Sequence, residues 1–391
     1  MLNTSLSPWP SFTQEEADAV SRVLLSNKVN YWTGSECREF EKEFAAFAGT
    51  QYAVALSNGT LALDVALKAM GIGAGDDVIV TSRTFLASAS CIVTAGANPV
   101  FADVDLNSQN ISAETIKAAL TPNTKAVIVV HLAGMPAEMD GIMDLAKEHD
   151  LRVIEDCAQA HGAKYKGKSV GSIGHVGAWS FCQDKIMTTG GEGGMVTTND
   201  KELWRKMWSY KDHGKSYDAV YHREHAPGFR WLHESFGTNW RMMEMQAVIG
   251  RIQLKRMPEW TARRQAHAAK LAESLGKFTG IRLIEIADYI EHAQYKFYAF
   301  VKPEHLKEGW TRDRIVNELN ARKVPCYQGS CSEVYLEKAF DNTPWRPKER
   351  LKNAVELGDT SLMFLVHPTL TDGEIAFCKE HIEAVLAQAT A

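Results

Sequence analysis

The chain has 391 residues, 45% of them hydrophobic, and a formal net charge of -5. At roughly 100 to 200 residues per domain, this length predicts two or three domains with a sizeable core. No run of five or six like charges occurs, which argues against nucleic-acid or membrane-surface binding and favours a small-molecule partner. The N-terminus lacks a basic start followed by an apolar core, and no stretch reaches the ~18 apolar residues of a spanning helix, so we expect a soluble, cytoplasmic protein.

The segment between about residues 40 and 200 alternates strand-like and helix-like pieces, as doubly wound α/β folds do. Most strand candidates are short, continuous apolar runs, which favour strands buried on both faces of a largely parallel sheet. They are residues 52–57, 78–82, 99–104, 126–131, 152–155, 178–182 and 194–198. Helical periodicity predicts helices over 61–70, 113–120 and 139–148.

Residues 211–240 break this rhythm and are rich in His, Tyr, Trp, Arg and Gly, which indicates a long functional loop or excursion. A helix-rich stretch follows over 242–275. The remainder mixes short strands, such as 299–302, with helices such as 312–321 and 374–388. We therefore predict a large α/β domain with an N-terminal arm over 1–250 and a smaller α+β domain over 251–391.

Cysteine and histidine spacings give no metal or disulfide signal. The seven cysteines form no C-x-x-C pair, so neither a disulfide framework nor a zinc ribbon is expected. The densest histidine group, His222, His225 and His233, matches no structural-zinc spacing and is better explained as an ordinary loop. A dinucleotide-binding protein is also disfavoured, because no G-x-G-x-x-G follows the first strand.

The turn Ser57-Asn58-Gly59-Thr60 connects an apolar strand to the helix expected from residue 61. A small-residue turn at a helix N-terminus exposes backbone N–H groups and the positive end of the helix dipole, so it suits a phosphate group. The same residue types also cap helices that bind nothing. The turn alone therefore leaves phosphate binding open.

Two further residues bring chemistry to the ends of neighbouring strands. Asp156 ends the run Val153-Ile154-Glu155-Asp156, at the strand end where α/β sheets place ligands. A carboxylate there can pair with the protonated ring nitrogen of pyridoxal phosphate (PLP), although an isolated Asp is more often a helix cap or a surface acid. Lys185 follows the next strand candidate and precedes a glycine-rich turn, where burial can hold an amine neutral for condensation with an aldehyde.

Taken in order, these and later motifs resemble those of the DegT/StrS-type sugar aminotransferases, from about Pro8 to Arg264. The motifs are Ser57-Asn58-Gly59-Thr60, Thr84-Phe85, Ile154-Glu155-Asp156-Cys157-Ala158-Gln159, Ser180-Phe181 with Lys185, Gly191-Glu192-Gly193-Gly194, and Gly237-Thr238-Asn239-Trp240-Arg241-Met242. The resemblance implies a fold-type-I PLP-dependent transferase that works as a homodimer with active sites at the subunit interface. Related sugar dehydratases carry a histidine in place of the lysine, so Lys185 favours transamination.

The resemblance also implies individual roles. Lys185 forms the Schiff base with PLP and then moves protons, and Asp156 pairs with the ring nitrogen. The residues implied to contact the phosphate are Gly59, Thr60, Ser180 and the partner subunit's Asn239. Two residues are implied to lie beside the ring: Gln159 at the phenolic oxygen and Phe85 stacked on the ring face. Core packing of Phe85 is compatible with stacking. Glu192 is placed near the substrate, although a plain turn residue explains it as well.

The substrate is less defined by the sequence. The implied reaction moves an amino group from an amino acid, such as L-glutamate, to a keto sugar used in cell-surface polysaccharide or lipopolysaccharide synthesis. Arg223 and Arg230 in the excursion can meet an anionic group, unless they are simply solvated. A nucleotide-linked keto sugar and an 8-oxo-3-deoxy-octulosonate remain alternatives, the second because residues 182–194 are similar to that branch. A sugar dehydratase and a non-catalytic PLP-binding regulator are the rival functions.

Overall fold

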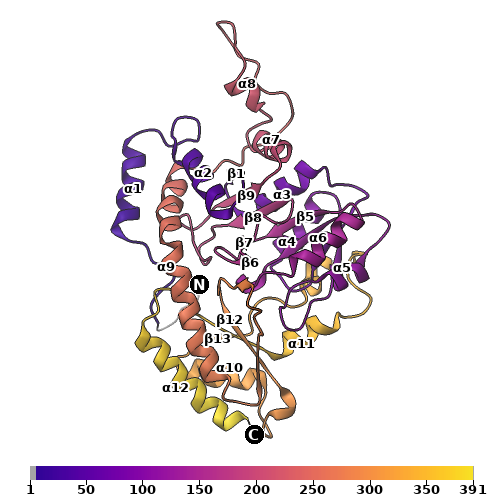
Figure 1. The fold of residues 1–391 in the computed structure, drawn as a ribbon, viewed down its shortest axis with the longest axis vertical. Coiled ribbons are helices and arrows are strands. Elements are labelled where there is room, and N and C mark those ends of the chain that lie inside the picture. The colour runs from indigo at the N-terminus through magenta and orange to yellow at the C-terminus, as the bar shows by residue number, and fades with distance from the viewer. Residues whose placement is uncertain (1–5, 391) are drawn as a thin grey trace.

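The computed structural model describes residues 6–390, which form a large sheet flanked by helices and a smaller C-terminal region (Figure 1). The large sheet has seven strands in the order β1-β9-β8-β5-β4-β2-β3. Their bounds are β1 Tyr52–Leu56, β2 Asp77–Thr81, β3 Asn98–Ala102, β4 Thr124–Val130, β5 Arg152–Asp156, β8 Val176–Ser180 and β9 Gly194–Thr198. Only β9 runs antiparallel to its neighbours, so the predicted largely parallel α/β fold is confirmed.

Both faces of this sheet are buried, which explains the unbroken apolar runs. In β1, Val54 packs into the same apolar cluster as helix α3, whereas Ala53 and Ala55 pack on the opposite face against Phe44. Alternate side chains of a strand point to opposite faces, so a strand covered on both sides has no polar face to preserve. The helices of this region are α2 Glu36–Ala48, α3 Gly59–Met70, α4 Ala87–Thr94, α5 Ala113–Ala119, α6 Met139–Glu148 and α7 Lys201–Tyr210.

Helix α9 (Glu244–Leu275) runs from the large sheet into the C-terminal region and carries the N-terminal helix α1 (Gln14–Leu25) along its side (Figure 1). The C-terminal sheet has the order β10-β12-β14-β13. Its elements are β10 Ile281–Leu283, β12 Phe297–Val301, β13 Cys326–Tyr327 and β14 Ser361–Phe364, with α10 Arg312–Ala321, α11 Lys352–Thr360 and α12 Asp372–Ala389. The domain boundary proposed between residues 250 and 251 lies within α9, so one helix links the two parts.

A three-stranded sheet, β11-β6-β7, joins the two regions. Its strands are β6 Lys164–Tyr165, β7 Lys168–Ser169 and β11 Ile290–Glu291, and four short 3-10 helices lie at Leu132–Gly134, Pro303–His305, Val334–Leu336 and Lys338–Phe340. Pairing of β6 with β11 connects a loop of the large domain to the segment before β12. No helix within residues 6–390 is both long and apolar enough to cross a membrane.

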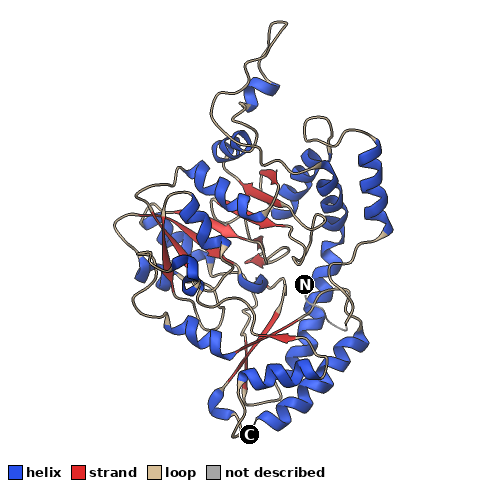
Figure 2. Cartoon of the chain, turned by 180° about the vertical axis from the view of Figure 1, so that it is seen from behind, coloured by secondary structure: helices blue, strands red, loops and turns tan. Residues whose placement is uncertain are grey.

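The predicted excursion is an arm that projects from the large domain and contains helix α8 (Tyr217–Tyr221) (Figures 1 and 2). Its apolar side chains are unusually exposed: Phe236 is 100% exposed, Trp231 81% and Phe229 76%. Large apolar side chains gathered on one projecting segment mark a surface that contacts another molecule.

Candidate active site

The turn after β1 and the end of β8 meet at one edge of the sheet. Asn58 caps α3 by accepting a hydrogen bond from the backbone N–H of Leu61 at 3.0 Å. A Cβ placed on Gly59 would lie 2.5 Å from the Cβ of Ser180, so this approach of two backbones requires glycine. The first turn of α3 therefore presents free N–H groups beside the Ser180 hydroxyl, which is a donor set suited to a phosphate.

Asp156 ends β5 and is 6% exposed. Its Oδ2 accepts a hydrogen bond from the Ser88 hydroxyl at 2.8 Å, and its Oδ1 accepts one from the Ala158 N–H at 3.1 Å. Ser88 lies 2.8 Å from the Thr84 hydroxyl, which fixes the position of the Ser88 side chain. Burial raises the pKa of Asp156 even though these hydrogen bonds and the charge of Lys185 act to lower it. The carboxylate is thus held by two hydrogen bonds and forms no ion pair with any described residue, as a partner for a ring-nitrogen cation should.

Lys185 lies in the loop between β8 and β9, and its side chain is 17% exposed. Its backbone carbonyl accepts a hydrogen bond from Trp9 Nε1 at 2.8 Å, so the N-terminal segment helps to hold this loop in place. The ammonium nitrogen lies 3.9 Å from Asp184 Oδ1 and 5.4 Å from the centroid of the Tyr295 ring. Asp156 ends β5 and Lys185 follows the neighbouring parallel strand β8, so both lie at the same edge of the sheet, and the charge of Lys185 acts to lower the pKa of Asp156.

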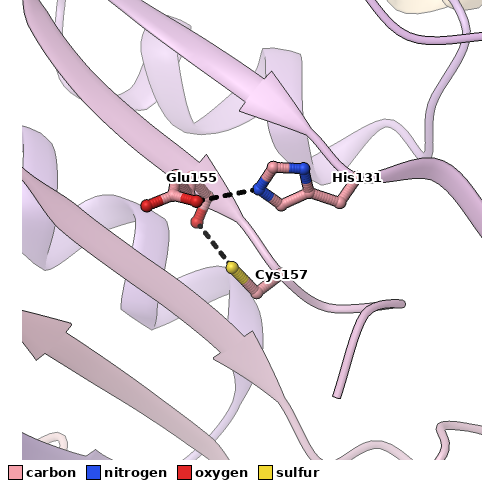
Figure 3. A group of neighbouring side chains, drawn as sticks. All are labelled: His131, Glu155 and Cys157. Atoms are coloured by element: carbon pink, nitrogen blue, oxygen red, sulfur yellow. Dashed lines mark hydrogen bonds and ion pairs between the residues drawn. The ribbon is translucent and has the colours of Figure 1, made fainter. Parts of the chain in front are cut away.

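Glu155, the residue before Asp156, lies in a different environment, shown in Figure 3 with His131 and Cys157. These three side chains place ligand-type atoms within 4.8 Å of one another. However, the Glu155 carboxylate already accepts four hydrogen bonds: from the N–H groups of Gly171, Ile173 and Gly174 at 2.8, 2.9 and 2.6 Å, and from His131 Nε2 at 3.0 Å. A cation would displace these bonds.

The tautomer of His131 is fixed by its neighbours, because its Nδ1 accepts the Ala137 N–H at 3.0 Å and its Nε2 must therefore donate to Glu155. Burial acts to raise the pKa of Glu155, but the hydrogen bonds from His131 and the backbone outweigh it and hold the pKa below its usual value. Glu155 is thus an anchor for the turn at 171–174, which supports the strand that carries Asp156.

The remaining residues expected at the cofactor lie around the same strand ends. Phe85 follows Thr84 directly and is 71% exposed, so one ring face is free for stacking. Gln159 is half-buried, and its Oε1 accepts the Ala133 N–H at 2.8 Å, which fixes the orientation of its amide. Thr60 is exposed at the first turn of α3.

The residues expected at the substrate, Glu192, Arg223 and Arg230, and the residue expected at the partner's phosphate, Asn239, are more scattered. Glu192 is exposed on the glycine-rich turn, with its Oε1 3.9 Å from the Cys182 thiol. Asn239 is exposed at the base of the arm, where it pairs with Asp212. Arg223 forms an ion pair with Glu234 at 2.7 Å within the arm, and the arm projects from the large domain (Figure 1). Arg230 is exposed in the same arm. One chain therefore does not bring Arg223 and Arg230 to Lys185.

The residues present fit PLP in each of its recognised features. A helix N-terminus with Gly59 and Ser180 suits the phosphate, a buried carboxylate suits the ring nitrogen, an exposed aromatic ring suits the ring face, and a lysine at the same edge suits the aldehyde. This combination on a seven-stranded, mostly parallel sheet defines a PLP-dependent aminotransferase.

Comparison with known proteins confirms this class. Residues 10–383 match the model of the DegT/DnrJ/EryC1/StrS aminotransferase family, and the chain belongs to that family. It is 41% identical to GDP-perosamine synthase of Caulobacter vibrioides over 86% of each chain. It is 36% identical to dTDP-3-amino-3,4,6-trideoxy-alpha-D-glucose transaminase of Streptomyces venezuelae over 82% of this chain and 79% of that one. The crystal structure of an aminotransferase from Psychrobacter cryohalolentis is 64% identical and superposes with a TM-score of 0.96 over 98% of this chain and 99% of that one.

Several residues at the site are absent from the sequence-based prediction. Ser88 positions Asp156 but lies four residues after Thr84 in a helix with no signal of its own. Tyr295, whose hydroxyl donates to Asp184, is 111 residues away in sequence. A run of aromatics around Lys296, Tyr295-Lys296-Phe297-Tyr298, is the one signal that points to a buried charge there.

Proposed function

We propose that this enzyme transfers an amino group from L-glutamate to a keto sugar, with Lys185 as the reacting amine. The observation that carries the proposal is that the buried carboxylate of Asp156 ends β5 and Lys185 follows the neighbouring parallel strand β8, at the same edge of the sheet. PLP supplies the aldehyde and the electron-withdrawing ring of such a reaction. The chain contributes a rigid carboxylate, an amine that accepts and returns protons, and N–H donors for the phosphate.

The proposed role of each cofactor-binding residue is compatible with its surroundings. Gly59, Thr60 and Ser180 bind the phosphate at the first turn of α3. Phe85 covers one face of the ring. Gln159, with its amide oxygen engaged by the Ala133 N–H, turns its amide nitrogen outward as a donor to the phenolic oxygen.

The proposed assembly is a homodimer with the active site at the subunit interface. The exposed aromatics of the arm, Phe229, Trp231 and Phe236, support a partner on that segment. In this assembly Asn239 reaches the phosphate of the partner's site. Arg223 and Arg230, which one chain holds away from Lys185, become available to an anionic part of the substrate bound in the other chain.

The proposed acceptor is a keto sugar for cell-surface polysaccharide or lipopolysaccharide synthesis in the cytoplasm. A nucleotide-linked sugar is supported by the relatives, which are named for GDP- and dTDP-linked sugars. A second candidate, 8-oxo-3-deoxy-octulosonate, is supported by an excess of unpaired cationic side chains close to Lys185, which suits a sugar acid.

The test is the visible absorbance of the PLP-loaded enzyme before and after addition of L-glutamate. The wild type and the control Lys168→Ala, an exposed lysine on β7, should lose the band of the bound cofactor as its amino form accumulates, whereas Lys185→Ala should not. Keto sugars should then restore the band. A band that responds to no amino donor indicates a PLP-binding regulator, and a product that has lost a hydroxyl without gaining an amine indicates a dehydratase.

A further inference from the structure

A second group of cationic side chains lies behind Lys185, where α9 meets the segment before β12. It consists of Arg264 on α9 and Lys296 beside Tyr295. Lys185 Nζ lies 5.4 Å and Lys296 Nζ 4.7 Å from the centroid of the Tyr295 ring, so both ammonium groups border the same aromatic side chain. The Tyr295 hydroxyl donates to Asp184, which fixes the position of the ring.

Arg264 is 1% exposed and largely without hydrogen-bond partners. Its Nη1 donates to the Tyr295 carbonyl at 3.4 Å, but its Nε and Nη2 have no partner among the described residues. The guanidinium lies over the Trp9 ring, 5.0 Å from its centroid, which is an attractive contact but not a neutralising one. Burial lowers the pKa of Arg264 to about 9. A buried cation in this state needs a counter-ion.

Lys296 is half-buried and shares this deficit. Burial, first of all, lowers the pKa of Lys296 to about 8; Asp184 acts to raise it, and the charges of Arg264 and Lys185 act to lower it further. The two histidines near the group, His161 and His367, neither add a positive charge nor act as a counter-ion. Burial lowers the pKa of both His161 and His367 to about 3, so they are neutral. Among the described residues, Asp184 is the acid whose charge acts on Lys296, and it is opposed there by the charges of Arg264 and Lys185.

We propose that Lys296, backed by Arg264, forms a subsite that binds a carboxylate of the substrate beside Lys185. This inference rests on the proposed aminotransferase function and adds a substrate group to it. Lys296, Lys185 and Asp184 all retain accessible surface, so a carboxylate can reach Lys296 from the side of Lys185 and accept a charge-assisted hydrogen bond. Arg264 contributes a positive charge that is held in place by burial. The carboxylate belongs either to the amino donor or to a sugar acid, since both carry one.

Equilibrium binding to the PLP-loaded enzyme tests this with three probes: 2-oxoglutarate, 3-deoxy-octulosonate and UDP-N-acetylglucosamine. A hydrogen bond to a charged group contributes about 1.5–3 kcal/mol, so Lys296→Met should weaken binding of a carboxylate probe about 10- to 100-fold. Lys296→Arg keeps the charge and should stay within about threefold of the wild type, which also separates loss of the ammonium from misfolding. Lys302→Met is the matched control, because Lys302 follows the far end of β12 directly.

The three probes give distinct outcomes. A loss confined to 2-oxoglutarate assigns the carboxylate to the amino donor, and a loss confined to 3-deoxy-octulosonate assigns it to the acceptor; either supports the subsite. The proposal is overturned if neither probe loses more than about threefold relative to Lys302→Met, or if UDP-N-acetylglucosamine loses as much as they do, because the site is then a general anion site. Binding needs no turnover, so a failure of transamination with L-glutamate would be seen separately.

Discussion

Asp156→Asn is the substitution that isolates the charge of the buried carboxylate. The amide has the same size, and its oxygen can still accept the hydrogen bond from Ser88, so the packing at the end of β5 is retained and only the bond from the Ala158 N–H is lost with the charge. What disappears is the negative charge opposite the ring nitrogen. Because Asp156 is 6% exposed, water cannot replace that charge.

The size of the effect follows from this burial. Breaking a buried charge pair costs about 3–5 kcal/mol, and about 1.4 kcal/mol corresponds to a factor of ten in rate. Part of the loss appears as weaker binding of PLP. We therefore expect the rate of the half-reaction with L-glutamate to fall about 10²- to 10³-fold in single-turnover stopped-flow absorbance measurements at saturating PLP.

Asp77→Asn is the matched control, because Asp77 is half-buried and accepts hydrogen bonds from Asn98 and Thr121 at the opposite end of the same sheet. It should leave the half-reaction rate unchanged. The reasoning is refuted if Asp156→Asn keeps more than about a third of the wild-type rate and PLP affinity, since a buried charge partner cannot be lost at so small a cost.

Three further predictions concern stability. Glu155→Gln should lower the free energy of unfolding by about 3 kcal/mol in urea denaturation, because one acceptor oxygen becomes a donor that faces N–H groups; an unchanged midpoint would contradict this. Lys211→Met should lower it by a similar ~3 kcal/mol, because Lys211 is fully buried and pairs with Glu41 at 3.3 Å; the charge-retaining Lys211→Arg should lose less. Hydrogen bonds, including those from Ser7, outweigh burial and hold the pKa of Glu374 at about 2, so its stabilisation is complete above its ordinary pKa near 4.5 and is lost as the pH falls towards 2. The difference in melting temperature between wild type and Glu374→Gln should therefore shrink below pH 4.5, and a difference that grows would exclude this linkage.

The large sheet could be predicted because its signal is local. Apolar runs locate all seven strands to within two residues at either end, since burial on both faces leaves few polar positions in the strand interiors. The strands β6, β7 and β11 could not be predicted. Each has two residues, and a periodicity in hydrophobicity cannot be detected in so short a segment.

In the candidate active site, too, the residues with a local sequence signal could be predicted and the long-range contacts could not. Asp156 and Lys185 follow apolar strands and could be located from the sequence alone. The contacts that hold them could not: Trp9 to the Lys185 carbonyl and Tyr295 to Asp184 join segments 176 and 111 residues apart. Such pairs are set by the tertiary arrangement, and one sequence carries no record of which side chains meet.

Two adjacent acids on β5, Glu155 and Asp156, have different roles: one stabilises the fold and the other serves the proposed reaction. Successive side chains of a strand point to opposite faces, so Glu155 and Asp156 enter different environments although the chain places them side by side. Glu155 meets four donors, and its charge is fully used in fixing the turn at 171–174. Asp156 meets only two donors, and burial raises its pKa, so a cation bound beside it would stabilise its ionised form. Loss of charge at 155 should therefore act mainly on stability, and the same change at 156 mainly on the reaction.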